Sequence, residues 1–464
     1  MSASAEPVRD AFAGVAEDQR LYYFRGLLKD FEKDVATKVE VFVQFRKWLD
    51  QLTDEVILRS LQRHYNPTYM NLLSVFGEER TNEEVHSLAI KCIKAKLWNE
   101  IEYSFYLSQL LELARSGWRG PDFATDQNLL RLKGWNLELI RSLLSCGRGL
   151  IICSFRLGTI RDLATDLALL GFPISQVVNQ PVYEGMQLAF NLLGPCPREA
   201  PPGPASTPHV ENIWLLKTLY AEDPRCTVEL ANALKRNEIF AFCIEGNTGA
   251  DGPWGDTSKS EIDFLGLRIA VKNGAARLAA ALRAPILPVI TLRDGATSGR
   301  IIFGEPIIAP LALKHSETEK FAQTAMQSLY AWMESYVRLH LEQWEGWSAL
   351  HRWRLCGDDV NASRSNTDPQ TIAGLLRDGK SFGVNRRRVA QLPTKDGVTW
   401  VDLKTLKGFQ NPKWAGEENV LATLSSPNGL DLAWINSSNS DPAWVEKIYL
   451  LLAYLQHSDL IAAR

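Results

Sequence analysis

Polar side chains that could do chemistry gather in two short segments, each of which directly follows an apolar run. The first reads Ser-Phe-Arg-Leu-Gly-Thr-Ile-Arg-Asp at 154–162, and the second reads Glu-Gly-Asn-Thr-Gly at 245–249. The apolar runs before them are too short for helices and are typical of buried strands. Because α/β folds place their ligands at the carboxyl edge of the sheet, we expect Arg156 and Glu245 to lie at one edge and to line one pocket.

Three further side chains are candidate nucleophiles or bases. Cys153 and Ser154 end the first apolar run. A cysteine beside an arginine can have a lowered pKa, whereas a cysteine buried in a strand is usually inert. His209 follows a segment at 194–204 that is too rich in proline for a helix or a central strand. It is either a displaced base or an ordinary exposed side chain.

The surrounding sequence predicts the elements that would position these residues in an α/β domain. A helix is expected from residue 160 to the stop formed by Gly171 and Pro173. Further strands are predicted at 174–178, 238–244, 284–290 and 301–306, and further helices at 227–236 and 271–283.

The turn at 154–162 resembles the one that carries the His-x4-Asp/Glu motif in the superfamily of lysophospholipid and lipid A biosynthesis acyltransferases. In that motif the histidine removes a proton from the acceptor hydroxyl, and the carboxylate orients the histidine. The histidine is absent from this chain. If Gly158 matches the family glycine, Arg156 stands at the base position and Arg161 at the acid position. If Asp162 matches the acid, Leu157 stands at the base position, and neither register supplies a base.

Other segments from about 125 to 355 carry the same resemblance. Glu245-Gly246-Asn247-Thr248 is similar to the Glu-Gly-Thr motif, and Phe264-Leu265-Gly266 resembles Phe-Phe-Gly. The segment 284–290 matches a proline-containing strand, and 338–354 looks like the tryptophan-rich ending of lipid A acyltransferases. Gln180 precedes a proline where the family often has arginine. The residues expected to bind substrate are Gly158, Gln180, Gly246, Asn247, Thr248 and Phe264.

The resemblance implies a mixed central sheet flanked by helices and a transfer of an acyl or aminoacyl group from an activated ester or thioester. The donor would be a carrier protein, CoA or another ester, and the acceptor a small molecule or lipid. Arg156 would stabilise the oxyanion or bind a donor phosphate. Asp162 would hold Arg156 or Arg161, and Glu245 would hold the acceptor or act as base. The alternative is a silent homologue that binds an acyl chain, a carrier protein or a partner enzyme.

The composition of the chain limits which other classes of function are possible. The chain of 464 residues has a net charge of −3, which gives no reason to expect DNA, and its seven cysteines show no C-x-x-C spacing. No metal site or cofactor is predicted. The first residues lack the pattern of a signal peptide, and no apolar run is long enough for a membrane span. We expect a cytoplasmic protein, and the sequence also allows peripheral membrane contact and a homo-oligomer.

Four parts are expected along the chain: a helical region at 1–120, the acyltransferase-like domain at 121–356, a linker at 357–383 and a small α+β module at 384–464. In the module, 420–424 and 430–435 are predicted to form a hairpin across Asn428-Gly429. Three consecutive arginines, 386–388, suit either contact with an acidic carrier or phosphate or a solvated strand edge.

Overall fold

The computed structural model describes most of the chain, with gaps. The described residues are 35–115, 130–193, 210–245, 259–294, 298–310, 313–355, 368–385, 388–394, 397–403, 408–409, 420–458 and 460–464.

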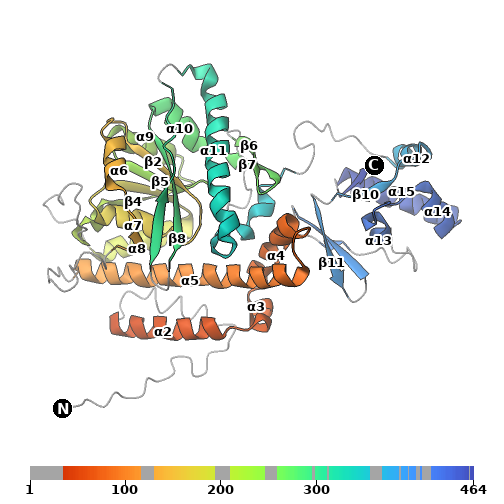
Figure 1. The fold of residues 1–464 in the computed structure, drawn as a ribbon, viewed down its shortest axis with the longest axis horizontal. Coiled ribbons are helices and arrows are strands. Elements are labelled where there is room, and N and C mark those ends of the chain that lie inside the picture. Colours follow the sequence, from red (N-terminus) through yellow and green to blue (C-terminus); the bar gives the residue numbers. More distant parts are fainter. Residues whose placement is uncertain are drawn as a thin grey trace, which may run out of the picture.

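A seven-stranded sheet forms the centre of the molecule (Figure 1). Its strand order is β1-β9-β8-β2-β5-β3-β4, and only the pairing of β8 with β9 is antiparallel among neighbours. The strands are β1 (Leu132–Lys133), β2 (Leu150–Ser154), β3 (Ile174–Val178), β4 (Leu216–Tyr220), β5 (Ile239–Cys243), β8 (Ile286–Arg293) and β9 (Gly299–Phe303). The predicted mixed sheet is confirmed.

The register of β2 and β5 brings the two polar segments together. Ile151 pairs with Phe240 and Ser154 with Cys243, so the two strands end side by side. Every residue of β2 is buried, because the strand has neighbours on both edges and helices on both faces. A parallel strand in this position reads as a continuous apolar run, which is why the sequence revealed it.

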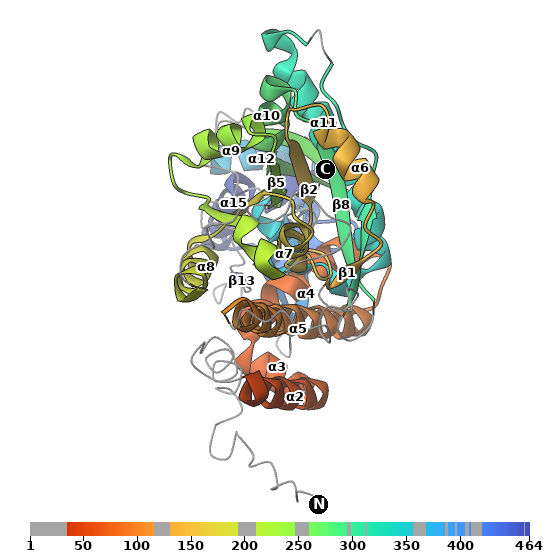
Figure 2. The same ribbon diagram turned by 90° about the vertical axis from the view of Figure 1, so that its left-hand side faces the viewer.

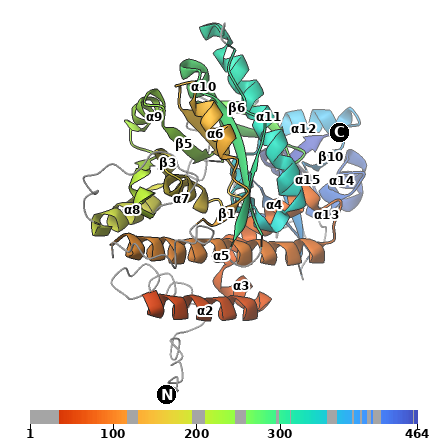
Figure 3. The same ribbon diagram turned by 60° about the vertical axis from the view of Figure 1, so that its left-hand side comes forward.

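Helices cover both faces of the sheet and bury alternating side chains of its strands (Figures 2 and 3). One face packs against α9 (Cys226–Lys235), α10 (Gly274–Leu282) and α11 (Thr318–Leu339). The other packs against α6 (Leu137–Leu144), α7 (Asp162–Leu169), α8 (Gln180–Leu193) and the 3₁₀ helix η1 (Val210–Leu215). Ile151 and Ile152 point to opposite cores, as the period of a strand requires.

The helix predicted at 271–283 begins only at Gly274. The residues before it form a hairpin of β6 (Lys259–Phe264) and β7 (Leu267–Lys272). Its two-residue turn is Leu265-Gly266, with φ of 54° and 75°. Positive φ at both central positions suits a hairpin turn. Phe264 therefore ends β6, and Leu265-Gly266 leads the chain into β7.

The N-terminal helices share the core of the sheet domain. They are α2 (Val35–Gln51), α3 (Asp54–Ser60), α4 (Gln62–Phe76) and α5 (Asn82–Arg115). Helix α5 runs without a break over 34 residues and crosses the end of the sheet (Figure 1). It begins with a capping box, since Glu84 Oε2 accepts from the Thr81 amide at 2.8 Å and Thr81 Oγ1 accepts from the Glu84 amide at 3.3 Å.

A tryptophan-rich run of three 3₁₀ helices follows α11. These are η3 (Leu341–Gln343), η4 (Glu345–Ser348) and η5 (Leu350–Arg352). Trp344, Trp347 and Trp353 of this run are buried in the main core. The tryptophan-rich run therefore packs into the core.

The C-terminal module has its own core, which begins before residue 384. α12 (Pro369–Arg377) packs against α15 (Pro442–His457), and Ile372 and Leu376 lie in the module's core. Short strands complete it: β10 (Phe382–Val384), β11 (Val389–Thr394), β12 (Gly397–Asp402), β13 (Gly408–Phe409) and β14 (Ile461–Ala463). The module touches the sheet domain where Met70 of α4 packs against Ala390, Val401 and Leu403.

The hairpin predicted at 420–435 is wrong. These residues form α13 (Val420–Ser425) and α14 (Leu432–Ser438). Val420, Leu421 and Leu424 share one buried face at helical spacing, and Asp431 caps α14 by accepting from the Trp434 amide at 2.8 Å.

In the described parts of the chain, no helix is long and apolar enough to cross a membrane.

Candidate functional site

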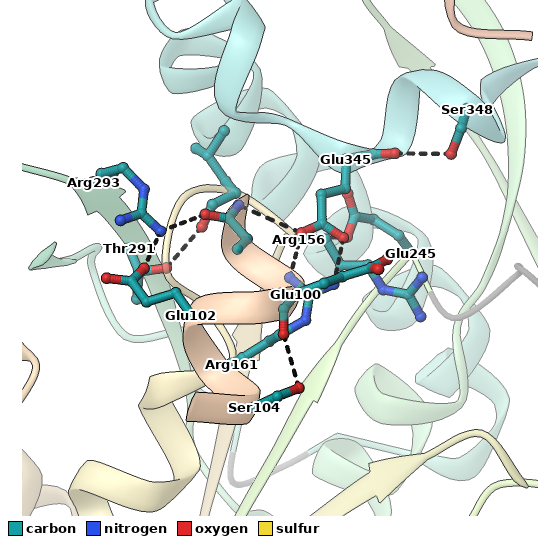
Figure 4. Close-up of polar contacts among 12 residues, drawn as sticks. Glu100, Glu102, Ser104, Arg156, Arg161, Glu245, Thr291, Arg293, Glu345 and Ser348 are labelled. Carbon is teal, nitrogen blue, oxygen red and sulfur yellow. Dashed lines mark hydrogen bonds and ion pairs between the residues drawn. The ribbon is translucent and has the colours of Figure 1, made fainter. Parts of the chain in front are cut away.

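The turns that follow β2 and β5 are joined at the carboxyl edge of the sheet. The Arg156 amide donates to Glu245 Oε2 at 2.5 Å, and the indole of Trp344 donates to Glu245 Oε1. Figure 4 shows Arg156 and Glu245 next to each other. The prediction that these residues lie at one edge is confirmed, and Trp344 is a partner that the sequence did not suggest.

Glu245 is a buried carboxyl group with an altered pKa. Its residue is 1% exposed, and burial raises the pKa to about 7. The charge of Arg156 and the hydrogen bonds from the Arg156 amide and the Trp344 indole oppose that rise. A carboxylate has about four acceptor positions, and two are used here. Burial therefore shifts Glu245 toward its protonated form, compared with an exposed carboxyl group.

We predicted that Asp162 would hold Arg156 or Arg161, but the guanidinium of Arg161 pairs with Glu345 instead. Its guanidinium makes a two-pronged contact with Glu345, with Nη2 donating to Oε2 at 2.8 Å and Nη1 to Oε1 (Figure 4). Arg161 and Glu345 side chains are 27% and 6% exposed. Burial alone would raise the pKa of Glu345, but Arg161 outweighs it and the pKa is lowered. A guanidinium binds a carboxylate most strongly through two parallel hydrogen bonds, and Glu345 accepts both from Arg161.

The turn is also held by its backbone. The Glu345 amide donates to the Arg156 carbonyl at 2.9 Å, and the Gly158 amide donates to the Gln343 carbonyl at 3.1 Å. Leu157 and Trp344 form an antiparallel bridge between these bonds. The segment 343–345 thus lies along the turn as a short added strand.

Asp162 belongs to a second buried cluster beside the turn. Its Oδ2 is 3.9 Å from Arg131 Nε, and Arg131 also binds Glu102 of α5. Burial raises the pKa of Asp162 to about 7, against the lowering effect of Arg131. Burial also raises the pKa of Asp166, whose Oδ2 accepts from the Leu132 amide at 2.8 Å. These carboxyl groups fix α7 and β1 rather than Arg156.

Helix α5 brings side chains to the same edge. Asn99 Nδ2 donates to Glu345 Oε1 at 3.5 Å, and Arg293 Nη2 donates to Asn99 Oδ1 at 2.6 Å. Arg293 also binds Glu102 (Figure 4). Lys96 lies one turn before Asn99 on the helix. No local pattern indicates these residues, because contacts between a remote helix and a turn have no fixed spacing along the chain.

Gly158 allows the close approach of the turn to the sheet. Its φ is +58°, and a Cβ would lie 2.5 Å from the carbonyl oxygen of Thr291 and 2.8 Å from the amide nitrogen of Arg293. Thr291 Oγ1 donates to the Leu157 carbonyl at 2.7 Å. The role of Gly158 shown here is steric.

A small hollow lies beside the turn, and the shared pocket predicted for Arg156 and Glu245 stays a prediction. The hollow at this edge measures about 10 Å³, and Arg156 and Glu245 do not line it. Trp344 and Glu345 occupy the space beside the turn. The hollow's lining includes Gly158, Arg161 and Asp162 from the turn and Asn99, Glu102 and Arg293 from other elements.

The remaining candidates are mostly away from this cluster or out of reach. Cys153 is buried, and burial raises its pKa, which disfavours the reactive thiolate. Ser154 is buried and donates to the Phe155 carbonyl at 3.2 Å. Gln180 is exposed and donates to Glu184 at 2.8 Å. Phe264 packs edge-on against Phe155. His209, Gly246, Asn247 and Thr248 lie outside the described residues.

Comparisons with known proteins add no family. Neither the models of protein families nor the curated proteins give a match to the chain.

The described residues contain no group of three or more His, Cys, Asp or Glu side chains that could hold a metal ion.

Proposed function

We propose that the chain transfers an acyl or aminoacyl group from an activated ester or thioester to an amine or hydroxyl acceptor. The observation that carries the proposal is the carboxyl group of Glu245, buried at the carboxyl edge of the sheet beside Arg156. Its raised pKa, about 7, is matched to proton transfer at neutral pH. Perturbed carboxyl groups of this kind are concentrated at functional sites.

Each residue has a distinct part in this mechanism. Arg156 stabilises the negative charge that forms on the carbonyl oxygen when the acceptor attacks, because a guanidinium stays charged and donates in a fixed plane. The acceptor forms a bond to the carbonyl carbon of the donor, and Glu245 takes the proton that the acceptor loses. Glu245 then gives this proton to the alcohol or thiol that leaves when the ester or thioester bond breaks. Arg161 and Glu345 hold the turn in place and do not touch the substrate.

An amine acceptor suits this site better than a hydroxyl. A neutral amine attacks without prior loss of a proton, whereas a hydroxyl needs a base during attack. A carboxyl group with a pKa near 7 can remove the proton from the tetrahedral intermediate of an amine. This difference compensates for the missing histidine.

The test uses a generic amine acceptor, since the natural one is unknown. The full chain is incubated with hydroxylamine and a panel of donors, namely acyl-CoA, acyl carrier protein and aminoacyl-tRNA, and hydroxamate is measured by mass spectrometry. Arg156→Ala should lower turnover by roughly a hundredfold, the scale for loss of one oxyanion donor. Arg156→Lys should recover only part of it.

Arg268→Ala is the matched control, because Arg268 is well exposed and pairs with Glu261 at 2.9 Å on the β6–β7 hairpin. It should leave turnover unchanged. Equal turnover for the wild type and Arg156→Ala on a donor that is used would refute the role of Arg156.

The second candidate is a silent homologue that binds an acyl chain, a carrier protein or a partner enzyme. The observation in its favour is the small space at the carboxyl edge of the sheet. There Arg161 and Glu345 are paired with each other, and the hollow beside them measures about 10 Å³. It predicts binding of a donor with no hydroxamate from any member of the panel. It also predicts that Arg156→His creates transfer by restoring a base.

A further inference from the structure

A second hollow, of about 260 Å³, lies at the end of the sheet where β2, β3 and β5 begin. There Ile239 of β5 pairs with Leu150 of β2 on one side and with Ile174 of β3 on the other. Helix α5 and the candidate site lie at the opposite end of the sheet (Figure 1). The described residues that line this hollow are all separate from the candidate site.

The inner wall of the hollow is apolar and fixed. It is formed by Leu144 at the end of α6, by Phe172 and Pro173 before β3, and by Ile239. Phe172 and Ile239 belong to a core of the sheet domain, and the Ile239 amide donates to the Pro173 carbonyl at 2.9 Å. The wall is therefore held by the sheet itself, as in most sites for small molecules, which are largely formed before the ligand binds.

The rim of the hollow presents N–H donors. Arg141 reaches it from the last turn of α6, has an exposed side chain and forms no ion pair within the described part of the chain. Asn237 Oδ1 accepts from the Gly149 amide at 2.9 Å, which leaves the two N–H groups of Asn237 Nδ2 as donors. Ser145, the third polar residue of the rim, donates its hydroxyl proton to the Ser142 carbonyl at 2.7 Å. The unused hydrogen-bonding groups of Arg141 and Asn237 are therefore all donors.

The charges near the rim favour an anion. Glu238, which follows Asn237, is already paired with Arg236 at 2.6 Å. The carboxyl end of α6 carries about half a negative charge, and the full charge of Arg141 in its last turn outweighs it. Three of the last carbonyl groups of α6 accept from the amides of residues 145–147, so they do not compete for the guanidinium.

We propose that this hollow binds a small carboxylate with a compact apolar body, through a two-pronged contact with Arg141 and a hydrogen bond from Asn237. The planar guanidinium matches the two oxygens of a carboxylate. The apolar body lies against Leu144 and Pro173, which are both half-buried. A cavity of about 150 Å³ is enough for benzene, so this hollow has room for a body of one or two rings. The proposal does not depend on any transfer of an acyl group.

The experiment measures binding of phenylacetate and of its neutral amide, phenylacetamide, to the full chain by ligand-observed NMR titration. Phenylacetate should bind with a dissociation constant below about 1 mM. Phenylacetamide should bind at least about tenfold more weakly, because it cannot form the charged two-pronged contact. No binding of phenylacetate, or equal binding of the two compounds, would overturn the proposal.

Two variants and a control locate the site. Arg141→Met should weaken phenylacetate by about tenfold without changing phenylacetamide, and Arg141→Lys should keep part of the affinity. Arg283→Met is the matched control, because Arg283 is exposed at the end of α10 on the other face of the sheet and does not line the hollow. Ser145→Trp should fill the hollow and remove the binding of both compounds.

Circular dichroism checks that each variant is folded. Arg141 and Ser145 are exposed, so neither change removes a core contact. A loss of affinity in Arg141→Met that is equal for phenylacetate and phenylacetamide would overturn the contact with the carboxylate. Unchanged binding of phenylacetate in a folded Ser145→Trp would overturn the location of the site.

Discussion

Replacement of Gly158 by alanine tests the close packing of the site turn against the sheet. The residue has a φ of +58°, and a Cβ there would lie 2.5 Å from a backbone oxygen and 2.8 Å from two other backbone atoms. These atoms belong to residues of the central strand β8 and cannot rotate away. Left-handed backbone at a residue with a Cβ costs about 1–2 kcal/mol, and forced overpacking costs about 1–3 kcal/mol more. We expect Gly158→Ala to lower the free energy of unfolding by about 2–5 kcal/mol.

Gly266 is the matched control, because it shares the positive φ without the contact. Its φ is +75°, and a Cβ would meet nothing within 4 Å. Gly266→Ala should therefore cost only the backbone component, about 1–2 kcal/mol. The difference between the two variants isolates the steric effect.

Urea unfolding followed by tryptophan fluorescence and far-UV circular dichroism supplies the measurement. Two probes are needed, because the C-terminal core can unfold in a separate transition. The transition that includes the main sheet is the one to compare. Equal losses in Gly158→Ala and Gly266→Ala would refute the account of the turn.

Three further predictions concern the charges and thiols around the site. Arg161→Met and Glu345→Gln should each lower the free energy of unfolding in urea by about 3 kcal/mol or more, because each change leaves a buried charge unpaired. The double variant should lose clearly less than the sum of the two, and additive losses would contradict the pairing. Since burial raises the pKa of Asp162 to about 7, the folded state binds its proton more tightly than the unfolded state, and the free energy of unfolding should fall as pH rises from about 4 to 8. Asp162→Asn should flatten that fall when unfolding is measured at several pH values, and an unchanged slope would count against the raised pKa. Iodoacetamide should label the exposed Cys146 and leave the buried Cys153 unlabelled in peptide mapping of the folded protein, whereas labelling of Cys153 would revive a covalent route.

Local patterns predicted the parts of the fold that depend on local chemistry. The apolar runs that became β2 and β5 were evident, because central parallel strands are apolar throughout. The same reasoning failed at 420–435, where Val420, Leu421 and Leu424 fit a short strand in sequence but share one face of α13. Short apolar runs do not distinguish a strand from a single helical turn of a buried face.

The site was predicted only as far as its two turns. The position of Arg156 and Glu245 at one sheet edge was predicted because each follows the end of an apolar strand, whereas the hydrogen bond between them was not predicted. Glu345 lies in the tryptophan-rich segment 338–354, and its ion pair with Arg161 depends on the path of the chain after α11. Asn99, which contacts Glu345, was missed for the same reason. Partners brought together by tertiary packing have no spacing in the sequence.

The joining of the turn to segment 343–345 has a consequence for synthesis of the protein. Glu345 follows Arg156 by 189 residues, yet its amide is the donor that satisfies the Arg156 carbonyl. At about 5–20 residues per second, a ribosome needs about 10–40 s to supply that donor after Arg156 has been added. During this interval the nascent sheet can pair β2 with β5, and Glu245 can bind the turn, but the turn still lacks Glu345 and the backbone partners in segment 343–345. A chaperone that binds the unfinished carboxyl edge would act in that window, before the tryptophans of the last 3₁₀ helices close it.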